Sequence, residues 1–171
     1  MDKKQIVVLK QTLDKIEPVS EGQEPTSELT QVIEELMPKA ELSQPDDDNI
    51  TVLLLLGTAL AKARRFKESC TFLENGISMI TDPKQDRTKK EYATQLIDLG
   101  SQMSTQKQQK NEGMELIFKY RNVLIEQYDR NNKMNNYIQE IGTQLSELKK
   151  ESQYAQMEKL YLSMFANDKL S

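Results

Sequence analysis

Apolar residues along this chain recur at spacings of three and four, which is the period of an amphipathic helix. Prolines, glycines and short polar runs separate the apolar stripes and predict turns between them. The stripes predict about eight helices, in residues 3–16, 27–37, 50–63 and 67–80, and in pairs within residues 86–128 and 131–166. The pattern therefore predicts an all-α protein.

Three glycines, 43 and then 42 residues apart, stand in the same apolar frame. Each follows a Leu or Ile and precedes, by three residues, a Leu or Met. A small residue ringed by apolar ones, recurring at a near-constant period, is typical of stacked helical hairpins. We therefore expect nine residues to pack one helix against the next: Leu56, Gly57, Leu60, Leu99, Gly100, Met103, Ile141, Gly142 and Leu145.

This frame divides the chain into an N-terminal segment and a repeat region. Residues 1–48 are expected to form a helical hairpin, or cap, that ends in an acidic linker. Residues 49–171 are expected to form three hairpins, at about 50–82, 86–128 and 131–166.

Two features of the first repeat helix add detail. Four adjacent leucines, Leu53 to Leu56, cover every side of a helix and predict that it is central and buried on several faces. Before it, the run Asp46-Asp47-Asp48 either caps and charges the helix N-terminus or binds a cation or a basic partner. Because no Asp-x-Asp-x-Asp-Gly pattern supports a calcium loop, the cap is the favoured interpretation.

One frame resembles the tetratricopeptide repeat: Leu53-x2-Leu56-Gly57-x2-Leu60, then Phe66, Ser69-x3-Leu73 and Pro83. Gly113 and Ile117 take the places of Ser69 and Leu73 in the second copy, and Ala155 that of Ser69 in the third. The family's aromatic positions are Leu, Gln or Met here, and the period exceeds the usual length of about 34. The resemblance implies a right-handed α-solenoid of antiparallel hairpins.

Stacks of this kind bind other proteins in a concave groove lined by the first helix of each hairpin. Helical phase gives six candidate partner-binding positions on those helices: Thr58, Lys62, Gln95, Gln102, Asn135 and Gln139. The predicted function is a non-enzymatic adaptor or scaffold that binds a peptide or helix of another protein.

Two alternatives stay open. One is a small cytosolic chaperone, similar to secretion chaperones, that masks a hydrophobic substrate. The other is a structural subunit of a larger assembly. The amphipathic C-terminal helix, Tyr154 to Phe165, favours homo-oligomers or complexes because no polar helix follows it.

The residue inventory offers little for catalysis. The chain has no histidine and one cysteine, Cys70, which excludes an internal disulfide, a Cys–His pair and a multi-ligand zinc site. We expect Cys70 to be a packed structural thiol. No Gly-rich phosphate loop is present. No catalytic residues, metal or cofactor are therefore expected.

Charge and hydropathy indicate which partners and which cellular location the chain suits. Residues 1–50 carry a net charge of −7 and residues 51–171 a net charge of +3, an asymmetry that can orient a partner. The positive charge is too diffuse to predict nucleic-acid binding. No apolar run approaches the roughly 20 residues of a membrane span. With a single cysteine and no secretion signal, the expected location is cytoplasmic.

One set of cations flanks the turns of the first predicted hairpin, at about 50–82. These side chains are expected either to dock an acidic peptide tail or to be ordinary solvated helix ends. They are Lys62, Arg64, Arg65, Lys67, Lys84, Arg87, Lys89 and Lys90.

Overall fold

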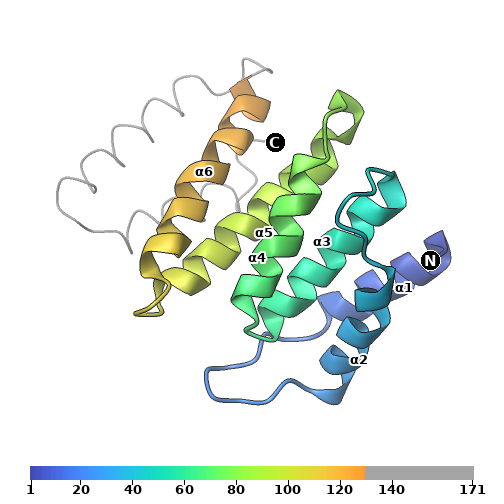
Figure 1. The fold of residues 1–171 in the computed structure, drawn as a ribbon, viewed down its shortest axis with the longest axis vertical. Helices are drawn as coiled ribbons and strands as arrows, with labels where there is room; N and C mark the ends of the chain where they lie inside the picture. Colours follow the sequence, from blue (N-terminus) through green and yellow to red (C-terminus); the bar gives the residue numbers. More distant parts are fainter. Residues whose placement is uncertain (130–171) are drawn as a thin grey trace. The chain divides into compact units, whose positions relative to one another are not determined.

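The computed structural model describes residues 1–129, where all regular structure is helical and no strand occurs (Figure 1). The elements are α1 Lys3–Asp14, α2 Ser27–Leu36, η1 Met37–Lys39, α3 Asp47–Lys62, α4 Phe66–Ser78, η2 Pro83–Gln85, α5 Asp86–Ser104 and α6 Lys110–Asp129. The predicted all-α class is confirmed for these residues. None of these helices combines the length and hydropathy that crossing a membrane requires. The third predicted hairpin, with Ile141, Gly142 and Leu145, lies outside the described residues.

Side-chain caps determine where the helices begin. Asp46 accepts a hydrogen bond from the Asn49 amide at 2.8 Å, so α3 begins at Asp47, three residues before the predicted start. The predicted cap function of the acidic run is thereby confirmed. Thr26 caps α2 in the same way, through the Leu29 amide at 3.2 Å. Each cap satisfies an amide that has no partner within its helix.

The chain forms two compact units, residues 1–95 and a second unit that begins at Leu96. The boundary lies inside α5, whereas the sequence suggested a division after residue 48. The first unit therefore contains both helices of the N-terminal segment, all of α3 and α4, and the first half of α5.

Helix α3 is the centre of the first unit. Its leucines Leu53 to Leu56 are all buried, as expected for a run that covers every side of a helix. Helices α1 and α2 pack on α3 through a shared apolar core (Figure 1). The core residues contributed by the N-terminal segment are Ile6, Leu9, Leu13, Ile16, Leu29, Val32, Ile33 and Leu36.

Helices α3 and α4 cross at Gly57. A Cβ atom on Gly57 would collide with the side chain of Leu73, which is fully buried. The Ser69 hydroxyl, also fully buried, donates a hydrogen bond to the Gly57 carbonyl at 2.6 Å. Because Gly57 has no side chain, the Leu73 side chain can fill the space beside α3. Because Ser69 is small, its buried hydroxyl can reach the backbone of α3.

The second unit contains a tighter crossing, between α5 and α6. An ideal Cβ on Gly100 would lie 2.5 Å from the carbonyl oxygen of Gly113, and the reverse contact is equally short. The two backbones therefore touch directly. Leu99, Met103 and Ile117 surround the contact and are buried.

The turn between α3 and α4 contains a left-handed residue. Arg64 has φ of 62°, and the Arg65 amide donates back to the Leu60 carbonyl at 2.9 Å. This hydrogen bond closes the C-terminal end of α3. The left-handed residue at such a helix end is usually a glycine. The Arg64 guanidinium lies 5.1 Å from the centre of the Phe66 ring, within range of a cation–π contact.

Candidate functional site

The first unit contains a groove of about 370 Å³ between α1, α3 and the first half of α5. We call it the basic groove. Its floor consists of three leucines, Leu13 of α1 with Leu54 and Leu55 of α3, which are almost fully buried. Its walls are polar and charged: Lys10, Asp14, Thr58, Arg87, Lys90, Glu91, Thr94 and Gln95.

Helix α3 anchors the α1 wall near its own C-terminus. The Lys62 ammonium donates to the carbonyls of Leu13 and Ile16, at 2.8 Å each. In return, the Lys62 carbonyl accepts from the Val19 amide at 2.9 Å. A cation at these carbonyls also complements the negative end of the α1 macrodipole.

Helix α3 anchors the α5 wall near its own N-terminus. The Gln85 side chain donates to the Asp47 carboxylate at 2.5 Å, just before α5 begins. Tyr92 is fully buried and its hydroxyl donates to the Ile50 carbonyl. Burial raises the pKa of Tyr92 far above its usual value, which keeps the phenol a neutral donor. Both walls are therefore held at defined places on one central helix.

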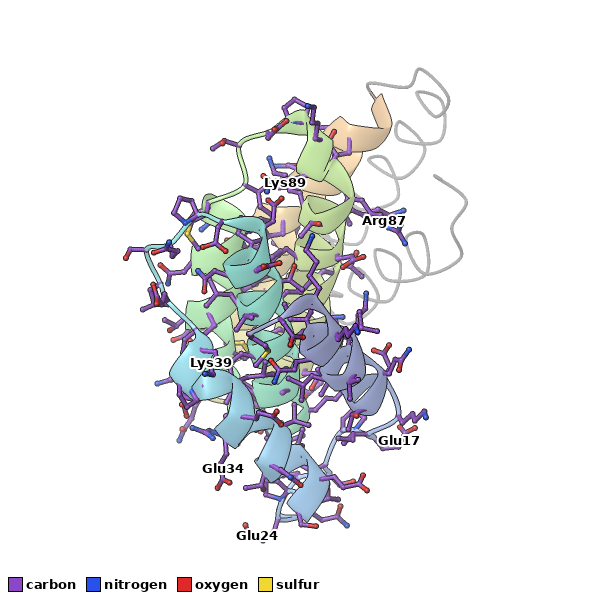
Figure 2. The ribbon with its side chains drawn as sticks, turned by 90° about the vertical axis from the view of Figure 1, so that its right-hand side faces the viewer. Glu17, Glu24, Glu34, Lys39, Arg87 and Lys89 are labelled. Carbon is purple, nitrogen blue, oxygen red and sulfur yellow. The ribbon has the colours of Figure 1, made fainter. Side chains whose placement is uncertain are left out.

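Three cations stand at the start of α5, where helix electrostatics opposes them, and Arg87 and Lys90 among them line the groove. Arg87, Lys89 and Lys90 lie within the first five residues of α5, at the positive end of its macrodipole. Figure 2 shows Arg87 projecting outward from the ribbon, and its side chain is 94% exposed. Its contact with Glu91, at 3.9 Å, is long and exposed and adds little stability. Neither the macrodipole nor the contact with Glu91 accounts for Arg87 at this position.

Two of the predicted partner-binding residues lie together in the basic groove. Thr58 and Gln95 come from α3 and α5 and both line it. Lys62 does not line it, because its ammonium is used on the carbonyls at the end of α1. Gln102 donates to Asp98 at 3.1 Å and belongs to the second unit. Asn135 and Gln139 lie outside the described residues.

Sequence reasoning missed the contribution of α1. Lys10, Leu13 and Asp14 line the basic groove, although their helix was assigned to a separate cap. The available signal was the spacing of Lys10 and Asp14, which places both on one face beside the buried Leu13.

The eight cations that were predicted to flank the turns make different contacts. Arg87 and Lys90 line the basic groove, whereas Lys62 and Arg64 make the contacts described above. Arg65 donates to Glu68 at 2.8 and 2.6 Å, and this hydrogen bonding raises the pKa of Arg65 and lowers that of Glu68.

No cluster of three or more Cys, Asp or Glu side chains within residues 1–129 is arranged to hold a metal ion. Cys70 is half-buried on α4, and its thiol contacts the Glu74 carboxylate at 3.5 Å. It does not line the basic groove.

Comparison with protein-family models, with curated proteins and with solved structures gives no match to this chain. The geometry and chemistry of the basic groove are therefore the basis for proposing a function.

Proposed function

We propose that this chain is a non-enzymatic adaptor that binds a segment of a partner protein in the basic groove. In this proposal the pairs α1/α2, α3/α4 and α5/α6 are hairpins of a tetratricopeptide-like right-handed solenoid. The groove would then be lined by the first helix of each hairpin, which is where such stacks bind peptides.

The observation that carries the proposal is the combination of an apolar floor with charged walls fixed to one helix. Leu54 and Leu55, which keep 7% and 5% of their surface exposed, would contact the tip of one partner side chain at the floor. Lys10, Arg87 and Lys90 outnumber Asp14 and Glu91 on the walls. A segment with apolar anchors and acidic flanks fits this chemistry best, because opposite charges steer association and select the partner.

The test begins with a random-peptide phage library of about 12-residue inserts, a length that spans roughly 40 Å when extended. The library is selected on the full chain, and enriched peptides are then measured by fluorescence polarisation. We expect apolar anchors flanked by Asp or Glu.

Two tyrosine variants locate the binding. Thr94→Tyr fills the basic groove, whereas Thr71→Tyr adds the same bulk on α4. The two threonines are both exposed and both donate to the carbonyl four residues earlier, at 2.8 Å in Thr94 and 3.1 Å in Thr71. Thr94→Tyr should weaken binding about tenfold, or about 1.4 kcal/mol, and Thr71→Tyr should leave it unchanged. Equal affinity for both variants would refute the proposal.

The same selection separates the alternative functions. A chaperone that masks hydrophobic substrates would enrich apolar peptides without an acidic preference. A structural subunit would enrich no peptide, and the chain would instead self-associate in sedimentation experiments.

A further inference from the structure

The first unit has a second groove, on the N-terminal hairpin, that shares no residue with the basic groove. It has a volume of about 500 Å³ and lies between α1 and α2. We call it the acidic groove. Its lining residues are Asp2, Lys4, Gln5, Val8, Leu9 and Thr12 from the α1 side, with Glu28, Gln31, Val32 and Glu35 from α2.

The shape of the acidic groove suits a helix. On α1 the lining residues Gln5, Val8, Leu9 and Thr12 follow the spacing of zero, three, four and seven. On α2 the lining residues from Glu28 to Glu35 follow the same spacing. Each set forms one ridge of a helix surface, and the space between two such ridges accepts a third helix. The pair α1/α2 already packs against one helix of this chain, α3, through its core residues.

The floor of the acidic groove is apolar, and an apolar residue beside it is exposed to solvent. Leu9 and Val32 are core residues, with 6% and 3% of their surface exposed. Val8 stands beside them with 59% exposed. Its neighbour Val7 is 53% exposed but does not line the groove. Val8 therefore offers apolar surface that a partner can bury.

The rim of the acidic groove carries three carboxylates and one lysine. Asp2 and Glu28 stand at the N-termini of α1 and α2, where negative charge stabilises a helix. Glu35 stands in the last turn of α2, which has no basic residue, and there the macrodipole opposes it. The lining of the acidic groove therefore carries three negative charges against one positive charge, and Glu35 is not explained by helix stability.

We infer that the acidic groove binds a basic amphipathic helix of a partner protein. The apolar row of that helix would cover Val8, Leu9 and Val32, and its Lys or Arg side chains would face Glu28 and Glu35. A second copy of this chain, docked through the same groove, would oppose carboxylates to carboxylates with only Lys4 from each side to compensate. Charge complementarity therefore favours the basic partner.

The test uses a fluorescein-labelled Leu/Lys peptide of about 14 residues, or roughly four helical turns, and a Leu/Glu peptide of identical pattern. Fluorescence polarisation with the full chain should give saturable binding of the Leu/Lys peptide, at least about tenfold tighter than that of the Leu/Glu peptide. Binding should weaken between about 0.05 and about 0.3 M salt, as expected for exposed charges.

Paired variants place the binding in the groove. Val8→Asn should weaken binding of the Leu/Lys peptide about fivefold or more, whereas Val7→Asn should leave its affinity unchanged. Glu28→Lys with Glu35→Lys should reverse the preference toward the Leu/Glu peptide. Glu21→Lys with Glu24→Lys changes the net charge equally and should not reverse it. These six positions are solvent-exposed, and circular dichroism checks that each variant keeps its fold.

Three results would overturn the inference: equal affinity for the two peptides, equal effects of Val8→Asn and Val7→Asn, or self-association that Val8→Asn abolishes. The last would assign the surface to a second copy. Thr94→Tyr should not affect binding of the Leu/Lys peptide. A failure of the inference for the acidic groove can therefore be distinguished from a failure of the proposal for the basic groove.

Discussion

At the crossing of α3 and α4, the effect of Gly57→Ala on the free energy of unfolding is expected to change sign with the residue at position 73. Gly57 is buried, and the atoms that a Cβ there would meet are Cγ and the two Cδ atoms of Leu73. All three lie beyond the Leu73 Cβ, so alanine at position 73 would remove them. The obstacle to a side chain on Gly57 is therefore one neighbouring side chain.

The magnitudes follow from two opposing effects of Gly57→Ala. Alanine stabilises a helix interior by about 1 kcal/mol relative to glycine. Overpacking against Leu73 costs about 1–3 kcal/mol. The net expectation in the wild-type chain is a loss of about 1 kcal/mol. With Leu73→Ala already present, which itself costs about 2–5 kcal/mol, the collision is absent and only the helix gain remains.

The assay is urea unfolding of the wild type, both single variants and the double variant. Coincident circular dichroism and tyrosine fluorescence transitions would justify a two-state treatment. Gly57→Ala should lower the free energy of unfolding by about 1 kcal/mol alone and raise it by about 1 kcal/mol in the Leu73→Ala background. The coupling of about 2 kcal/mol exceeds the about 0.5 kcal/mol typical of independent sites. Equal effects in both backgrounds would refute the proposed packing.

Three further predictions concern single positions. Gly100→Ala should lower the free energy of unfolding by about 2–3 kcal/mol, because its Cβ would meet the Gly113 backbone; a urea midpoint at or above that of the wild type would contradict this. At Arg64, where φ is 62°, the glycine variant should unfold at higher urea than the alanine variant by about 1 kcal/mol, and the reverse order would argue against the left-handed turn. Lys62→Met should cost about 1–3 kcal/mol and speed amide hydrogen exchange at the end of α1, since two carbonyls lose a charged donor; unchanged exchange would contradict the anchoring contact.

The helices were predictable because each has a local signal. Apolar spacing identified each α-helix within residues 1–129 but neither 3-10 helix, and Thr26 and Asp46 cap α2 and α3 through their own side chains. Boundaries were less accurate, because three polar residues at the start of α3, Asp47, Asp48 and Asn49, belong to the helix without contributing to its apolar stripe. The left-handed conformation of Arg64 carried no signal, since an arginine does not indicate a positive φ.

The grooves were harder to predict than the helices because each is a property of several elements together. Helical phase placed Thr58 and Gln95 on outward faces, and both line the basic groove. The same phase argument placed Lys62 there, but a long side chain can reach along the helix to carbonyls 46 and 49 residues away in sequence. The acidic groove needed the packing of α1 against α2, which no spacing in one helix contains.

Helix packing also changes the meaning of the charge asymmetry in the sequence. A division at residue 50 separates a net charge of −7 from one of +3, but the first compact unit extends to Gln95. It therefore includes the cations at the start of α5 as well as the carboxylates of α2, which line separate grooves. At physiological salt, charges act over about 8 Å, so a partner responds to the rim it approaches and not to the net charge of the chain. Two grooves of opposite charge in one unit can therefore select two different partners, and added salt should weaken both interactions while leaving the packed core between them intact.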